Sequence, residues 1–169
     1  EKLGIPVRSL NDPSVDGRLD LVIDGADEID SRRRVTKGGG GALLIEKVIA
    51  YASAVVVIVA DESKLVDRLG LSFPIPVEIA AEARRAVIRK IEALGGRGDL
   101  RPAERKMGPV ITDNGNPILD VTFEEEFDPN AMERELDSIP GVLGNGIFAA
   151  MAPVIYVGAE DGGVRRLST

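Results

Sequence analysis

The stretch from Leu19 to Asp61, LDLVIDGADEIDSRRRVTKGGGGALLIEKVIAYASAVVVIVAD, contains the pattern that decides the fold. Its segments 19–23 and 54–60 are short, β-branched and almost continuously apolar, which is typical of strands buried on both faces of a parallel sheet. Between them, residues 42–52 repeat apolar side chains at helical spacing, directly after four glycines. The order strand, loop, helix, strand predicts a right-handed βαβ unit. The apolar helical face is expected to consist of Leu44, Ile45, Val48, Ile49 and Ala52.

A second pattern covers residues 74–148 and has the order β-α-β-β-α-β, which predicts a ferredoxin-like unit. Asp128 and Pro129 are expected to begin its second helix, as the capping residue and the first helical residue. The expected elements of this unit are a strand at 73–79, a helix at 81–94, strands around 97–101, 110–112 and 118–121 with an Asn-Gly turn, a helix at 130–139 and a strand at 146–149.

The remaining segments extend the first unit. Residues 62–69 are expected to form a short helix, and the apolar strand 154–157 is expected to return to the first sheet. The sequence therefore predicts an α/β fold. A Rossmann-like parallel-sheet catalytic domain is formed by residues 1–73 and 149–169, and a ferredoxin-like α+β domain of residues 74–148 is inserted into it.

Composition excludes several classes of protein. The 169 residues include 21 Lys and Arg against 28 Asp and Glu, and a net charge of −7 argues against binding of nucleic acid. No apolar run is long enough to span a membrane, so we expect a cytoplasmic protein without a membrane partner. The chain has no cysteine, so Cys-ligated metals and thiol nucleophiles are excluded.

Histidine is also absent from the sequence. Ser-His-Asp triads, His-ligated metals and imidazole acid-base catalysis are therefore excluded. Any proton transfer near neutral pH must use a carboxylate or a lysine.

Acidic residues follow both expected parallel strands. Asp24 and Asp61 come directly after them, and ligands of open α/β sheets bind at this end of the strands. Asp27 and Glu28 lie in the same turn as Asp24. Acids after a strand are also common turn residues, but two strand ends that both deliver acids favour a functional site.

Four glycines, Gly38 to Gly41, precede the first helix. Their bare backbone N–H groups suit the binding of an anion at the helix N-terminus, and Lys37 adds a charge beside them. The spacing matches neither the Walker A loop nor the dinucleotide-binding glycine motif. A flexible linker is the alternative interpretation.

Glu46 and Lys64 are further candidates. Glu46 lies about one turn into the helix, at the edge of its apolar face, where burial raises the pKa of a carboxylate and makes it a better base at neutral pH. Lys64 can reach the same edge of the sheet. An exposed Glu46 beside Lys47 and a solvated Lys64 are the alternatives, and periodicity does not decide between them.

The sequence resembles the ribose-5-phosphate isomerase A family through nearly its whole length. Six motifs occur in the order found in that family, and together they are highly specific. They are DGADEID at 24–30, KGGGGALLIEK at 37–47, VADESK at 59–64, FPIPVEI at 73–79, VITDNGNPILDV at 110–121 and IPGVLGNGIFA at 139–149.

The resemblance implies interconversion of D-ribose 5-phosphate and D-ribulose 5-phosphate in the non-oxidative pentose phosphate pathway, through an enediolate and without a metal or organic cofactor. It implies that Glu46 is the general base, that Asp24 and Asp27 handle protons at the sugar hydroxyls, and that Lys37 stabilises charge. It also implies a homodimer or homotetramer. The implied substrate-binding residues are Asp24, Gly25, Ala26, Asp27, Lys37, Gly38, Gly39, Gly40, Gly41, Asp61 and Lys64.

One part of the family pattern is not found. Family members carry a Gly-Thr-Gly-Ser-Thr type loop that binds the substrate phosphate, and the first residues here, EKLGIPVRSLND, match the family after that region. We therefore expect the N-terminal part of the α/β domain to be missing, which leaves apolar surface of the sheet uncovered. Two alternatives remain: a sugar-phosphate-binding or inactive relative, and a magnesium site for phosphoryl transfer.

Overall fold

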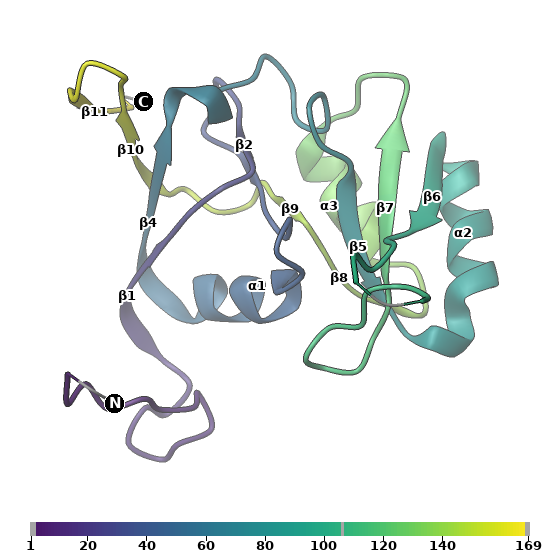
Figure 1. Ribbon diagram of the computed structural model, residues 1–169, viewed down its shortest axis with the longest axis horizontal. Coiled ribbons are helices and arrows are strands. Elements are labelled where there is room, and N and C mark those ends of the chain that lie inside the picture. Colours follow the sequence, from purple (N-terminus) through teal and green to yellow (C-terminus); the bar gives the residue numbers. More distant parts are fainter. Residues whose placement is uncertain (1–2, 106, 168–169) are drawn as a thin grey trace.

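A computed structural model describes residues 3–105 and 107–167. Its first layer is a four-stranded sheet in the order β1-β4-β10-β11, in which β1, β4 and β10 are parallel and β11 is antiparallel to β10. Helix α1 lies between β1 and β4 in the chain (Figure 1), so the expected βαβ unit and the return of the strand near residue 155 are confirmed. The bounds are β1 Leu19–Asp24, α1 Leu43–Ala52, β4 Ser53–Asp61, β10 Val154–Gly158 and β11 Val164–Arg166.

The strands of this sheet are not buried on both faces as expected. Alternate residues of a strand point to opposite faces, and Leu21, Ile23, Val55 and Val59 all lie on exposed positions. The opposite face carries Ile58, which packs with α1 in one core. The continuous apolar pattern therefore reflects one buried face and one face that remains exposed.

Helix α1 also packs differently from the prediction. Leu43 and Ala50 are buried, whereas Ile45 and Val48, which were expected on the packed face, are exposed. The buried stripe is rotated toward Glu46 and Lys47, which are only partly exposed. This rotation brings a carboxylate and an ammonium group toward the interior of the molecule.

The second layer is an antiparallel sheet in the order β6-β7-β5-β8, with α2 and α3 in the connections (Figure 1). Strands numbered by their occurrence in this unit follow the order 2-3-1-4, which is the ferredoxin-like arrangement. The predicted fold class is confirmed, while the residue limits of the two units stay a prediction. The bounds are β5 Ile75–Ile79, α2 Arg84–Ala93, β6 Gly96–Leu100, β7 Ile118–Phe123, α3 Pro129–Asp137 and β8 Val142–Asn145.

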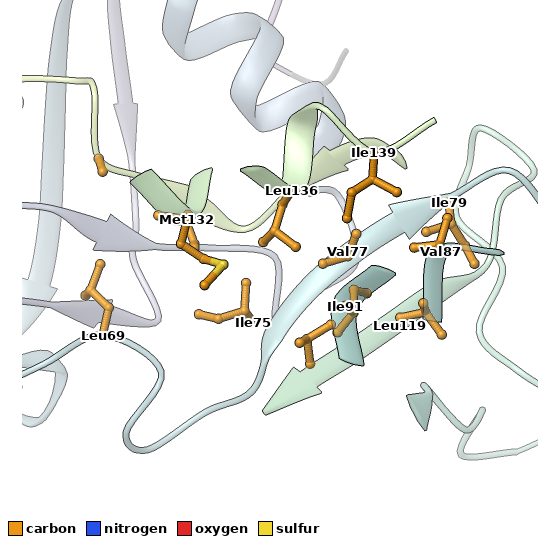
Figure 2. Packing of buried hydrophobic residues seen from close by; sticks show 13 residues of the cluster. Leu69, Ile75, Val77, Ile79, Val87, Ile91, Leu119, Met132, Leu136 and Ile139 are labelled. Atoms are coloured by element: carbon orange, nitrogen blue, oxygen red, sulfur yellow. The ribbon is translucent and has the colours of Figure 1, made fainter. Parts of the chain in front are cut away.

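The core of this unit is shown in Figure 2. Side chains from β5, such as Val77, meet Ile91 of α2 and Leu136 of α3, and all three are fully buried. Burial of one such side chain contributes about 1.5–3 kcal/mol relative to leaving it exposed. The antiparallel sheet therefore has a well-packed core that fixes the positions of residues at its ends.

Two further local predictions were wrong and one was confirmed. Only the 3-10 turn η1 (Glu62–Lys64) forms in the expected helix 62–69, because the backbone N–H of Val66 bonds to the Ile29 carbonyl (2.9 Å) instead of continuing a helix. The expected strand 110–112 is reduced to a single bridge from Ile111 to Pro117. Helix α3 begins as predicted, with the Asp128 side chain accepting from the Asn130 N–H at 3.2 Å.

The expected strand 146–149 differs as well. The fourth strand of the antiparallel sheet is β8, which ends just before the expected strand begins. β9 (Ile147–Phe148) instead joins β2 (Glu28–Ile29) and β3 (Val35–Thr36) in a small third sheet. In addition, the 3-10 turn η2 (Ala81–Ala83) precedes α2. Strands β2 and β3 were not predicted, because two-residue strands carry no periodicity.

No helix in the described ranges 3–105 and 107–167 is long and apolar enough to cross a membrane.

Candidate active site

Three charged side chains from separate elements meet at one end of the parallel sheet. The Lys37 ammonium lies 2.9 Å from an Asp24 oxygen and 3.3 Å from a Glu46 oxygen, and it donates to the Gly25 carbonyl at 2.7 Å. Asp24 ends β1, Lys37 follows β3 and Glu46 lies in the first turn of α1. These three partners match the three donors of an ammonium group, so Lys37 is held in one position.

The small third sheet places Lys37. Its strand β3 pairs with β9, and the Lys37 backbone N–H donates to the Gly146 carbonyl at 2.9 Å. The ammonium group also lies 5.9 Å from the centre of the buried Phe148 ring, within the range of a cation–π contact. Only 4% of the Lys37 side chain is exposed, so its charge acts at short range with little screening by water.

The Glu46 carboxyl group lies in surroundings that change its pKa. Burial raises the pKa of its carboxyl group above the usual value, Lys37 opposes the shift, and the charges of Asp24 and Asp27 add to it. One oxygen contacts Lys37, while the other, Oε2, is buried and has no hydrogen-bond partner in the part of the chain that the structure describes. A buried acceptor without a partner is costly, and here it is available to take a proton. The raised pKa agrees with the sequence prediction.

The glycine loop is organised around Asp27. The Asp27 carboxylate accepts from the Gly39 N–H at 2.8 Å, and a Cβ on Gly39 would lie 2.9 Å from it. Gly38 has a φ of +101°, and a Cβ there would lie 2.7 Å from that of Leu43, so only glycine fits. A Cβ on Gly40 would meet nothing within 4 Å, so this peptide borders open space. The Gly41 N–H closes the turn onto the Gly38 carbonyl at 2.9 Å.

A cavity of about 580 Å³ adjoins the loop. Lys64 lines it with its ammonium group 5.3 Å from the centre of the Phe73 ring, so this lysine and the glycine loop face one space. Asp27, Gly39 and Gly40 line the same cavity, whereas Asp24, Lys37 and Glu46 are not among its lining residues. Asp61 caps η1 through the Ser63 N–H at 2.8 Å, and Ala26 packs against the core of the first unit.

Two residues near the site were missed from the sequence. Arg101 follows β6 and donates to the carbonyls of Gly38 and Gly39, but in the sequence it is one of many arginines in charged segments. Phe73 lines the cavity because buried Glu28 accepts from the N–H groups of Gly70, Ser72 and Phe73. Glu28 stands in the same acidic turn as Asp24, yet it has a structural role that no local spacing distinguishes.

Within residues 3–105 and 107–167, no three acidic, histidine or cysteine side chains are grouped in a way that could hold a metal ion.

Comparison with known proteins points to one family. Residues 1–162 match the family described as ribose 5-phosphate isomerase A (phosphoriboisomerase A). The ribose-5-phosphate isomerase A of Synechococcus sp. (strain WH7803) is 48% identical over 164 residues, which cover 96% of this chain and 68% of that protein.

Solved structures agree with this match. The ribose 5-phosphate isomerase A of Methanocaldococcus jannaschii aligns with a TM-score of 0.84 and 44% identity, covering 90% of this chain and 67% of that one. A D-ribose-5-phosphate isomerase in complex with phospho-erythronic acid aligns with a TM-score of 0.91 and 42% identity, covering 99% and 72%. At this identity and coverage, the likeness extends to sequence as well as fold. The chain belongs to the ribose 5-phosphate isomerase A family.

Proposed function

We propose that this protein is an aldose–ketose isomerase that interconverts D-ribose 5-phosphate and D-ribulose 5-phosphate, with Glu46 as the general base. One observation carries the assignment of the base: a buried Glu46 oxygen has no partner among residues 3–105 and 107–167, and it lies beside a fully engaged Lys37. Membership in the family supports the choice of substrate. The absence of histidine from the chain agrees with a carboxylate base.

The reaction needs a base that moves one proton between two neighbouring carbons. Glu46 removes the proton from C2 of the open-chain aldose, next to the C1 carbonyl, and returns it to C1. The enediolate formed between these steps carries negative charge close to the Lys37 ammonium, which stabilises it electrostatically. A second proton passes from the C2 oxygen to the C1 oxygen, and we assign its transfer to Asp24, which contacts Lys37 at 2.9 Å.

Asp27 and Lys64 complete the proposed site. Asp27 borders the cavity and is assigned to the sugar hydroxyls, where it assists opening of the furanose ring. Lys64 lines the same cavity and provides a positive charge for the substrate phosphate. Asp61 stays a proposed substrate contact, although its carboxylate caps η1.

Glu46→Gln tests the base. The substitution keeps the size of the side chain but removes the proton acceptor, so kcat should fall by about 10²–10⁴-fold. Binding of phospho-erythronic acid, measured by calorimetry, should be largely retained. Glu92→Gln, an exposed position on α2, is the matched control and should leave kcat unchanged. Near-normal turnover by the Glu46 variant would refute its assignment as the base.

The alternatives give different results in the same assays. A binding protein or inactive relative would bind phospho-erythronic acid without isomerising ribose 5-phosphate in the protein as its gene encodes it. A magnesium-dependent phosphoryl transferase would lose its activity in EDTA, whereas the proposed isomerase keeps it.

We also propose a homodimer or homotetramer that works in the cytoplasm. Support for self-association comes from apolar side chains that are exposed on α1 and beside it, including Ile45, Val48, Tyr51 and Leu143. Sedimentation at several concentrations tests the association, and a monomer at all of them would contradict it. Fractionation of cells tests the compartment.

A further inference from the structure

Arg101 stands out because it reaches the glycine loop from the antiparallel sheet. It follows β6, and its backbone is fixed by bonds from its N–H to the Ile118 carbonyl (2.9 Å) and from the Val110 N–H to its carbonyl (2.8 Å). Its guanidinium group donates from one nitrogen, Nη1, to the carbonyls of Gly38 (2.9 Å) and Gly39 (3.0 Å). The glycine loop is therefore held by a residue of the ferredoxin-like unit.

The rest of the guanidinium group is bound to Asp120 on β7. Nε lies 3.0 and 3.1 Å from the two Asp120 oxygens, and Nη2 lies 2.6 Å from one of them. With both Nη1 hydrogens on the glycine carbonyls, one N–H each on Nε and Nη2 is used as well, so four of the five donors are occupied. Only 15% of the side chain is exposed. Arg101 is thus committed to the protein and has little left for a ligand.

Together with these contacts, the geometry of the peptide bond determines the direction of the Gly40 N–H. In a trans peptide the C=O and the N–H point in opposite directions. The Gly38–Gly39 peptide is held at both ends, with its C=O on Arg101 and its N–H on Asp27 at 2.8 Å. The C=O of the next peptide is also on Arg101, so the Gly40 N–H is turned away from the guanidinium group.

The Gly40 N–H is a free donor at the cavity. Among the described residues it has no acceptor, and Gly40 lines the cavity together with Asp27 and Lys64. A Cβ built on Gly40 would meet no atom within 4 Å, so the space at its side-chain position is open. A fixed backbone N–H without an acceptor is the type of group that stabilises a developing oxyanion.

We propose that Arg101 is a positioning residue of the isomerase, which fixes two glycine peptides and turns the Gly40 N–H toward the substrate oxygen that becomes negative. This role rests on the proposed function, because it needs an enediolate to stabilise. Asp120 is part of the same device, since it orients the guanidinium group from the opposite side. The two units of the fold are thereby joined at the catalytic loop.

Kinetics of Arg101 variants test the proposal in the protein as its gene encodes it. Arg101→Ala should lower kcat by about 10²-fold, as expected when a reacting group loses its alignment. Arg101→Lys should also lose activity, by about tenfold or more, because one ammonium group cannot bridge two carbonyls and a carboxylate. Methylguanidine at millimolar concentration should restore part of the kcat of Arg101→Ala. Arg97→Ala, an exposed position on β6, is the control and should keep its kcat.

Calorimetry with phospho-erythronic acid separates positioning from folding. Both Arg101 variants should bind the analogue with the stoichiometry of the unmodified protein and with weaker affinity. Unchanged kcat in both variants would overturn the proposal. A lower stoichiometry of binding, with normal kcat per remaining binding site, would also overturn it, because Arg101 would then affect only folding. If the unmodified protein binds the analogue but does not isomerise, the proposed function fails, while the affinities still report whether Arg101 orders the loop.

Discussion

Two lysines with similar contacts, the buried Lys37 and the partly exposed Lys47, have different proposed roles, one in chemistry and one in stability. Both contact a glutamate, and both ammonium groups lie near the Phe148 ring, at 5.9 and 4.9 Å from its centre. Lys37 contacts Glu46 at 3.3 Å, and Lys47 contacts Glu133 on α3 at 2.7 Å. The two pairs have the same composition but different surroundings.

The surroundings of Glu133 satisfy both of its oxygens. One accepts from Lys47 and from the Tyr51 hydroxyl (3.3 Å), and the other accepts from the backbone N–H groups of Ala149 (2.9 Å) and Ala150 (3.2 Å). Glu46 has one oxygen on Lys37 and one without a partner among the described residues. A carboxylate whose acceptors are all occupied holds elements together, whereas one with a free buried acceptor is suited to take a proton.

The largest contrast is expected from the same substitution at the two lysines. Lys37→Met removes the charge that we propose faces the enediolate, so kcat should fall by about 10²–10³-fold. Lys47→Met leaves Glu133 buried without its cation and should lower the free energy of unfolding by about 3–5 kcal/mol. Turnover in a coupled assay and urea unfolding of both variants measure the two effects. Equal profiles for the two variants would contradict the division of roles.

A smaller contrast is expected for the two glutamates, and it depends on pH. Burial raises the pKa of Glu46 in the folded state, so its contribution to stability is fully present below its usual pKa and is lost as the pH rises through the raised value. Ionised Glu46 therefore costs stability, and Glu46→Gln should raise the melting temperature at pH 7 relative to its effect at pH 4. Glu133→Gln should lower the melting temperature, because the substitution disturbs the hydrogen bonds that satisfy both oxygens of Glu133. The expected loss in the free energy of unfolding is about 1–3 kcal/mol. Thermal unfolding of both variants at pH 4 and pH 7 tests these expectations. A change in melting temperature that is less positive for Glu46→Gln at pH 7 than at pH 4 would contradict the stated effect of Glu46.

The smallest effect is expected at the edge of the Lys47 pair. Burial and the neighbouring Glu133 raise the pKa of the Tyr51 phenol to about 12. Tyr51→Phe removes one hydrogen bond to Glu133 and should cost about 0.5–1.5 kcal/mol of stability without a change in kcat. Ultraviolet titration of the tyrosines checks the pKa, and a titration of Tyr51 at its usual pKa would argue against the contact.

Much of the fold followed from local patterns. The parallel strands, α1 and the capped start of α3 were predicted because periodicity and capping depend on neighbouring residues. The two-residue strands β2, β3 and β9 were not, because they are too short to show periodicity and β3 pairs with β9 across more than 100 positions. The packed face of α1 was also misjudged, since its buried stripe includes Glu46 and Lys47 and is set by Glu133 and Phe148.

In the candidate site too, residues in local motifs were predicted and residues that act through distant contacts were not. Asp24, Lys37 and Glu46 were predicted individually, and the structure brings their charged groups together. Arg101 and Glu133 were beyond prediction, because each acts on a loop or helix of the other unit and carries no motif of its own. Their partners are defined only once the two sheets are packed.

The most direct test of the account is the pKa of Glu46 itself. Carbon-13 NMR of the side-chain carboxyl groups, with Glu46→Gln to assign the signal, measures it without reference to turnover. A midpoint above the ordinary value of 4.5 is expected, because the carboxyl group is partly buried and one of its oxygens has no partner among the described residues. A midpoint at or below 4.5 would mean that the Lys37 ion pair outweighs burial, and it would contradict the claim that Glu46 is held ready as a base.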